Sequence, residues 1–295
     1  MNEYSEAEAL ALIRLRHWQH LLNEMLKDRT FKVPVHLAIG HEAAAVAMDV
    51  TLQPDDVLCL THRNGAYNLA RAKSLHAELK HYLLEEPAGG ASHMASMNLA
   101  LDDTGIMYAS SILGNNLAVA CGIAFNRKLT KRPGVVFATS GDGAIEEGVF
   151  WESLVFAQSH ELRGVIALEN NDFSLGSSIA ERRCEIDVSR VCAAVGASYR
   201  RADGARLADI KATLQAARDD ALRGAVSVVE LDIKTFNQHA GPTPGWPADP
   251  RRISIADGLL MTDRSGDPLD HLRQTMGQTE FDALARVVVQ ESYDV

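Results

Sequence analysis

Short apolar runs that alternate with helical stretches constrain the fold of this chain most strongly. From Gly40 onward, helical patterns separate four such runs, at Val57 to Leu60, Gly134 to Thr139, Gly164 to Glu169 and Val226 to Ile233. Strands that alternate with helices of this length build crossover units with parallel strands. The two middle runs are continuously apolar, as is typical of strands covered on both faces. The sequence therefore predicts an α/β fold with a doubly wound, mostly parallel sheet, and these two runs at its centre.

Both ends of the chain have helical patterns. Apolar residues at helical spacing predict an N-terminal helix over residues 5–28. Four prolines between Gly241 and Pro250 predict a long loop. After it, Asp267-Pro268 opens one helix and a second follows from Thr279 to Glu291, so we expect a helical tail at about 267–291.

The composition excludes several classes of protein. The chain has 29 basic and 39 acidic residues, a net charge of −10 and no long basic run, which argues against nucleic acid as a partner. Its longest apolar stretch, Leu117 to Phe125, is too short to span a membrane. The first twenty residues fit neither a signal peptide nor a transit peptide, and the four cysteines are isolated. We expect a cytoplasmic protein without a membrane partner.

The run that ends at Thr139 leads into Gly141-Asp142-Gly143. In an open parallel sheet, ligands bind beyond the carboxyl ends of the strands. Glycines beside Asp142 let the backbone approach an anion, and the amides of Gly143 and Ala144 can point at phosphate oxygens. A carboxylate there repels phosphate unless a cation lies between them, and Mg²⁺ accepts such oxygen ligands. This loop therefore predicts a diphosphate site with a bound Mg²⁺.

A second oxygen donor is expected at the end of the neighbouring strand. The run Gly164 to Glu169 ends in Asn170-Asn171, and Asn171 follows Asp142 by 29 positions, the length of one crossover unit. A neutral amide suits this place, because a second carboxylate would weaken the attraction of the metal for phosphate. Gly-Asp-Gly alone is more often a tight turn, so the prediction depends on the combination with Asn170-Asn171.

The combination resembles the fingerprint of thiamin-diphosphate enzymes. Nearly the whole chain is similar to the alpha subunit of the 2-oxo acid dehydrogenases for pyruvate, branched-chain substrates and acetoin. The motifs that carry the resemblance are Gly40-His41-Glu42-Ala43, Pro54-Asp55-Asp56, Thr61-His62-Arg63, Gly89-Gly90-Ala91-Ser92-His93-Met94, Ile112-Leu113-Gly114-Asn115-Asn116, Glu169-Asn170-Asn171-Asp172-Phe173 and Asp267-Pro268. It implies the thiamin-diphosphate-binding fold as one diphosphate-binding domain over residues 1–295, with thiamin diphosphate and Mg²⁺ as cofactors.

The resemblance also implies roles for individual residues. The family's metal ligands correspond to Asp142, Asn171 and the backbone carbonyl of Phe173. Its aromatic-arginine pair, which grips the diphosphate, corresponds to His62 and Arg63, with histidine in place of the aromatic residue. The loop beneath the cofactor corresponds to Ser110 to Asn116, where Ser111 is a contact and Leu113 props the two rings into the bent shape that permits proton transfer between them. Packing within the core is the alternative role for Leu113.

His239 is the predicted catalytic residue. In the family, a histidine in the corresponding segment faces the reacting carbon, and an imidazole there can exchange protons or steady a developing negative oxygen. The family's neighbouring arginine, glycine and serine are absent from Lys234 to Ala240, so the phosphate grip is weaker unless Lys234 substitutes. Because Ala240 replaces the serine that kinases modify, no phosphorylation is expected there. His93 has either a channel-lining or a structural role.

A partner subunit is implied as well. Thiamin chemistry needs a glutamate on the aminopyrimidine, and in the family a separate beta subunit supplies it. We expect this alpha-type subunit and a beta-type, pyrimidine-binding subunit to form a heterotetramer that decarboxylates a small 2-oxo acid and passes the acyl or enamine intermediate to a lipoyl group on an acyltransferase, or to an aldehyde. The alternatives are the N-terminal half of a split transketolase and a non-catalytic cofactor-binding or assembly subunit.

Overall fold

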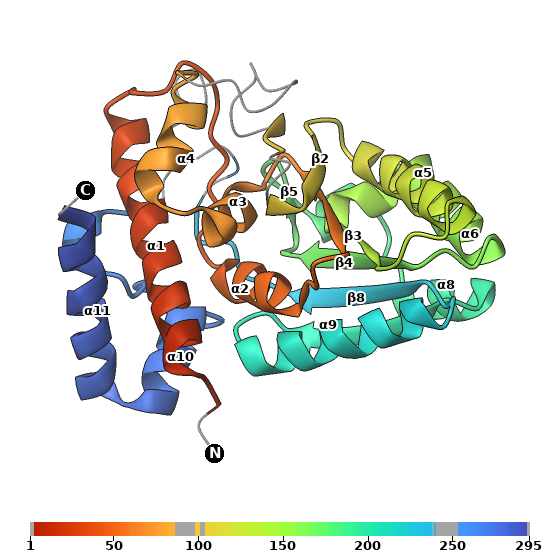
Figure 1. Ribbon diagram of the computed structural model, residues 1–295. Coiled ribbons are helices and arrows are strands. Elements are labelled where there is room, and N and C mark those ends of the chain that lie inside the picture. Colours follow the sequence, from red (N-terminus) through yellow and green to blue (C-terminus); the bar gives the residue numbers. More distant parts are fainter. Residues whose placement is uncertain (1–2, 86–97, 101–103, 238, 240–252, 294–295) are drawn as a thin grey trace.

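A six-stranded parallel sheet forms the centre of the molecule (Figure 1). The computed structural model describes residues 3–85, 98–100, 104–237, 239 and 253–293. The strand order is β2-β1-β3-β4-β8-β7. The strands are β1 Val57–Thr61, β2 Ile106–Ser110, β3 Val136–Gly141, β4 Gly164–Asn170, β7 Ser198–Asp203 and β8 Ser227–Asp232. The predicted parallel sheet is confirmed, and the two continuously apolar runs are its central strands, β3 and β4.

The sequence patterns did not predict the edge strands β2 and β7. Both mix buried residues with more exposed ones, and β7 contains Arg200 and Arg201. An edge strand is covered less completely than a central one, so it needs no continuous apolar run. The degree of coverage by helices therefore decides whether a strand shows a continuous apolar run, as β3 and β4 do, or a mixed composition, as β2 and β7 do.

Helices cover both faces of the sheet, because successive strand residues point to opposite faces. One face packs against α2 (Glu42–Thr51) and α9 (Leu207–Leu222), through strand residues Leu58, Leu60, Phe137, Val165, Ala167, Val229 and Leu231. The other face packs against α5 (Asn115–Leu129), α6 (Gly148–Ser159) and α8 (Val188–Val195), through Val57, Cys59, Val136, Ala138, Ile166, Leu168 and Val228. The fold is thus doubly wound, as expected.

Shorter elements connect these layers. They are α3 Gly65–Arg71, α4 Leu75–Tyr82, η3 Asp142–Glu146, β5 Phe173–Ser174, β6 Ser177–Ser178, α7 Ile179–Arg182 and η4 Ile255–Asp257, where η marks a 3₁₀-helix. The predicted loop at Gly241 to Pro250 lies outside the described residues, as does His93. None of the helices in the described part of the chain is long and apolar enough to cross a membrane.

The two ends of the chain pack together outside α2 (Figure 1). Helix α1 (Glu6–Lys27) begins at a capping box in which Ser5 and Glu8 exchange hydrogen bonds, and Asp28 is its C-cap. The tail contains α10 (Pro268–Met276), which Asp267 caps, and α11 (Gln278–Tyr293), which packs against α1. Helices therefore occupy both terminal segments in which the sequence has helical patterns.

A fully buried ion cluster joins α1, α2 and α10. The Arg16 guanidinium donates to both carboxylate oxygens of Glu42, at 2.7 and 3.0 Å, and to Oδ1 of Asp267 at 2.8 Å. All three side chains have no exposed surface. Removing one partner of such a cluster leaves buried charge without compensation, which costs about 3–5 kcal/mol. The cluster fixes how the two ends of the chain meet the sheet layer.

We expect Arg16→Met to lower the free energy of unfolding by about 3–5 kcal/mol, because Glu42 and Asp267 would keep two buried charges without a cation. Urea denaturation measures this change. Arg14→Met is the matched control on the same helix, since the Arg14 pair with Glu291 is exposed, and it should cost less than about 1 kcal/mol. Equal effects of the two substitutions would contradict the role of the cluster.

Candidate cofactor site

The carboxyl ends of three adjacent strands meet at one small cavity. Because β1, β3 and β4 pair in parallel register, Thr61, Gly141 and Asn170 end at the same edge of the sheet. The cavity has a volume of about 60 Å³. It is lined by His41, Thr61, His62, Arg63, Leu113, Gly141, Asp142, Gly143, Glu169, Asn171, Phe173, Ser174 and His239. Ligands in open parallel sheets bind at this edge.

Most of the predicted site residues come together here. The cavity lining contains His62, Arg63, Leu113, Gly141, Asp142, Gly143, Asn171, Phe173 and His239. Leu113 lies in this lining with 37% of its surface exposed. Two predicted contacts do not line the cavity: Ser111 is exposed beside Leu113, and Ala144 is buried in η3.

The glycine loop is packed closely on one side and open on the other. A Cβ on Gly143 would lie 2.7 Å from Oγ of Ser174, so glycine is required for the loop to contact β5. A Cβ on Gly141 would meet no atom within 4 Å. Gly141 caps η3, which begins within the loop at Asp142 and ends before α6 begins at Gly148. The loop thus leaves space on the cavity side of Gly141, where a phosphate can approach the backbone.

Asp142 is almost completely buried and already faces a cation. Oδ2 of its carboxylate is 2.5 Å from Nη2 of Arg182 in α7, and the same guanidinium contacts Glu146 at 3.0 Å. Burial raises the pKa of Asp142, although the hydrogen bond and the charge of Arg182 act in the opposite direction. The sequence patterns did not identify Arg182. It lies forty positions from Asp142 and is in no quoted motif.

A hydrogen-bonded chain orients the amide of Asn171. Its Nδ2 donates to Oγ1 of Thr235 at 2.6 Å, and its Oδ1 accepts from the backbone N–H of Phe173 at 3.1 Å. Thr235 also contacts Nε2 of His41 at 2.7 Å, and Nδ1 of His41 contacts Glu169 at 2.9 Å. These contacts fix which end of the Asn171 amide is oxygen, so that Oδ1 remains on the Phe173 side as a possible metal ligand.

His62, His239 and Arg63 form another part of the cavity lining. Nη1 of Arg63 donates to the Leu37 carbonyl at 2.5 Å, and its Nη2 lies 3.2 Å from Nδ1 of His239. Burial lowers the pKa of Arg63 to about 10. Burial, with a smaller contribution from Arg63, lowers the pKa of His62 to about 3 and that of His239 to about 4. The imidazoles are therefore neutral at physiological pH.

Lys234 does not replace the arginine that the resemblance leads one to expect. Its ammonium pairs with Asp263 at 2.5 Å and lies over the ring of Phe236, and it is not part of the cavity lining. Lys234 therefore does not lie where it could take the place of that arginine in this structure. Among the described residues, Arg63 lines the cavity, and Arg182 reaches it through the carboxylate of Asp142.

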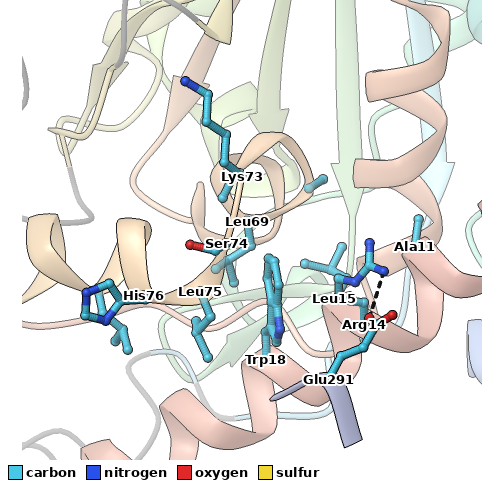
Figure 2. Close-up of a pocket in the computed structure, with 13 residues that line it drawn as sticks. Ala11, Arg14, Leu15, Trp18, Leu69, Lys73, Ser74, Leu75, His76 and Glu291 are labelled. Atoms are coloured by element: carbon cyan, nitrogen blue, oxygen red, sulfur yellow. Dashed lines mark hydrogen bonds and ion pairs between the residues drawn. The ribbon is translucent and has the colours of Figure 1, made fainter. Parts of the chain in front are cut away.

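A larger cavity of about 460 Å³ lies elsewhere, between α1, α3, α4 and α11. Figure 2 shows Trp18 standing across it, with His76 on one side and the ion pair of Arg14 with Glu291 on the other. Leucines and alanines make up much of its lining. Its charged and polar side chains do not converge on one point, whereas those of the smaller cavity do. Size therefore does not identify the reactive site in this chain.

Comparisons with known proteins show the family and the fold of this chain. The model of the dehydrogenase E1 component family matches residues 15–239. Pyruvate dehydrogenase E1 component subunit alpha-1 of Arabidopsis thaliana, a mitochondrial protein, is 25% identical over 92% of this chain and 69% of its own length. The alpha subunit of acetoin:2,6-dichlorophenolindophenol oxidoreductase from Bacillus subtilis is 28% identical over 55% of this chain and 49% of its own. Transketolase from Campylobacter jejuni superposes with a TM-score of 0.58 at 16% identity, covering 75% of this chain and 37% of that chain.

The six-stranded parallel sheet with helices on both faces is the fold that this chain shares with transketolase. The chain belongs to the dehydrogenase E1 component family, and within it to the alpha-type subunits of the 2-oxo acid dehydrogenases. Enzymes of this family use thiamin diphosphate, and their alpha subunits work with beta subunits. The likeness to transketolase, at 16% identity, shows the fold alone. The family assignment therefore favours the first hypothesis over a split transketolase.

We expect His62 and His239 to remain neutral down to pH 5, because burial disfavours their charged forms. Histidine ¹⁵N chemical shifts between pH 7 and pH 5 measure this. Since the pKa values are lowered in the folded state, the unfolded chain binds the extra protons, so stability falls as the pH falls below about 6.5. Titration of either ring near pH 6.5 in the folded protein would contradict the prediction.

Proposed function

We propose that this chain holds the diphosphate of thiamin diphosphate through Mg²⁺ and, with a beta-type subunit, decarboxylates a small 2-oxo acid. The observation that carries the proposal is that Asp142, Asn171, Phe173 and Arg63 line one cavity at the carboxyl edge of the sheet. The acyl group then passes to a lipoyl group or to an aldehyde acceptor. Similarity to both pyruvate dehydrogenase and acetoin oxidoreductase alpha subunits is consistent with either acceptor.

The donors at the cavity fit a hard divalent cation. Asp142 offers a carboxylate oxygen, Asn171 an oriented amide oxygen and Phe173 its backbone carbonyl, and Mg²⁺ prefers such oxygen ligands. Arg182 holds Oδ2 of Asp142, so the metal would take the other oxygen. The amides after Gly141 and the guanidinium of Arg63 would hold the phosphate oxygens.

When bound, thiamin diphosphate supplies the carbanion chemistry at its thiazolium ring. Leu113 would support the bent shape of the cofactor from below, since it lies in the cavity with part of its side chain exposed. His239 would present Nε2–H to the reacting oxygen, because Nδ1 of the neutral ring faces Arg63. His239 is the catalytic residue that we propose for this chain.

An apolar surface beside the cavity is where we expect the beta-type subunit to bind. Large apolar side chains are exposed on the loop before α5, on the segment after β4 and on α6: Ile112, Leu113, Phe173, Leu175, Trp151, Val155 and Phe156. The loop packs against the start of α6, since a Cβ on Gly114 would lie 2.7 Å from Val149. Clustered exposed apolar side chains mark interaction surfaces. A partner on this surface would close the cavity and complete a site in a heterotetramer.

The same oxygen donors argue against a non-catalytic subunit. A subunit with only an assembly role has no need of a carboxylate buried at a strand end, where burial raises its pKa and disfavours its charged form. Asp142 keeps that costly position, and the amide of Asn171 is oriented beside it. We therefore prefer the catalytic function.

We expect Asp142→Asn to weaken Mg²⁺-dependent binding of thiamin diphosphate to the alpha–beta complex by about a hundredfold, because a charged ligand of the metal becomes neutral. Isothermal titration calorimetry with and without Mg²⁺ measures the change. Asp219→Asn, on the exposed surface of α9, is the control and should leave binding unchanged. Unchanged affinity in Asp142→Asn would refute the metal assignment, and absence of Mg²⁺-dependent binding in the parent complex would refute the proposed function.

We expect Phe156→Asp to reduce assembly with the beta-type subunit at least tenfold, because a charge would be buried in an apolar interface. Sedimentation velocity of the co-expressed subunits measures the fraction assembled. Leu222→Asp is the matched control: Leu222 is 37% exposed, Phe156 is 40% exposed, and Leu222 lies at the end of α9. Equal assembly of the two variants would show that the partner binds elsewhere.

A further inference from the structure

Three histidine rings lie against one another beside the cavity. The ring centroids of His36 are 4.9 Å from those of both His62 and His239, and the centroids of His62 and His239 are 5.3 Å apart. One nitrogen from each ring lies within 4.8 Å of the others. The rings come from three separate segments, before α2, at the end of β1 and after β8. We refer to His36, His62 and His239 as the imidazole cluster.

The cluster is polar without being charged. Burial is the largest cause that lowers the pKa of all three rings, to about 2 for His36, about 3 for His62 and about 4 for His239. A neutral imidazole has one N–H donor and one acceptor nitrogen. Among the described residues, Nδ1 of His36 has no hydrogen-bond partner, although His36 is only 5% exposed. A buried polar atom without a hydrogen bond is unfavourable.

Two of the three rings of the imidazole cluster line the cavity in which the substrate would react. His62 and His239 both line the cavity, and His36 packs edge-on against both rings. His62 stands where the resemblance has an aromatic residue, so one wall of the cavity offers hydrogen bonds in place of a purely apolar surface. A ligand with oxygen atoms at this wall can form hydrogen bonds with the histidine rings, whereas an apolar acyl group cannot.

Geometry and charge argue against a metal ion at the cluster. Nη2 of Arg63 lies 3.2 Å from Nδ1 of His239, so a cation held by these rings would be close to a buried guanidinium. Like charges at such a distance repel strongly where water is excluded. The hydrogen bond from Arg63 also occupies one nitrogen of His239. Hydroxyl groups of a neutral or anionic ligand are not repelled by Arg63, and they can form hydrogen bonds with the other ring nitrogens.

We propose that the imidazole cluster selects substrates that carry a hydroxyl group next to the reacting carbonyl, either on the 2-oxo acid or on the aldehyde acceptor. The inference rests on the proposed function, because it needs the cofactor and the reacting carbonyl at this cavity. His62 is the specificity-determining residue of the cluster, since it lines the cavity, is no ligand of the metal and leaves the charged contact with the diphosphate to Arg63 beside it.

Pyruvate and 3-hydroxypyruvate, which differ by one hydroxyl group, test the proposal in the alpha–beta complex. We expect kcat/KM to favour 3-hydroxypyruvate, and His62→Phe to lower the ratio of the two kcat/KM values at least tenfold. His62→Gln, which keeps a donor and an acceptor, should retain more of the preference. His76→Phe, an exposed histidine on α4, is the control and should leave the ratio unchanged.

Binding is measured separately. The alpha–beta complex is loaded with an unreactive analogue of thiamin diphosphate, in which a carbon ring replaces the thiazolium ring, and each acid is titrated into it by calorimetry. The same preference in Kd supports the proposal. An unchanged ratio in His62→Phe, while the parent complex binds thiamin diphosphate, overturns this inference alone. A parent complex that does not bind the cofactor overturns the proposed function as well. Stoichiometric Co²⁺ absorption bands that disappear in His62→Phe would show a metal site and overturn the hydroxyl assignment.

Discussion

The parallel register of β1, β3, β4 and β8 is the constraint on which the site depends. Gly141 pairs with Glu169, and Asn170 pairs with Asp232, so the strands end side by side. Asp142 and Asn171 are thereby brought to one cavity although a helix and a strand separate them in the chain. The apolar residues of the same strands are divided between two cores, one on each face of the sheet. Packing of the two cores therefore fixes the positions of the strand ends, and the strand ends fix the positions of Asp142 and Asn171.

Around this rigid edge, buried charges are balanced locally. Asp142 faces Arg182, Glu169 accepts from Tyr67 and contacts His41, and Arg16 joins Glu42 to Asp267 on the outer side of α2. Such pairs contribute little net stability, but each leaves an expensive charge if one partner is removed. At the cavity, one oxygen of the Asp142 carboxylate faces Arg182, and the amide of Asn171 is oriented by Thr235 and Phe173.

In the proposed function the cavity forms only part of a thiamin site, and a partner subunit would complete it. The chain offers oxygen donors for a metal, a guanidinium for phosphate and neutral imidazoles toward the reacting end. The apolar side chains of Val155 and Phe156 in α6 and of Leu175 after β5 are exposed in this chain. A partner that covered them would exclude water, and exclusion of water strengthens every hydrogen bond and charge interaction inside the site.

The sequence by itself determined the central strands, the glycine loop, Asn171 and the terminal helices, because continuous apolar runs, helical periodicity and glycine placement are local signals. It did not indicate the edge strands β2 and β7, whose mixed composition suits half-covered positions. Arg182, the Thr235–His41–Glu169 contacts and the imidazole cluster were decided only by the tertiary structure. Arg63 and His239, for example, are 176 positions apart and meet only because the fold brings β1 beside the segment after β8. No local sequence pattern predicts such a contact, because it forms only when the folded chain brings the two segments together.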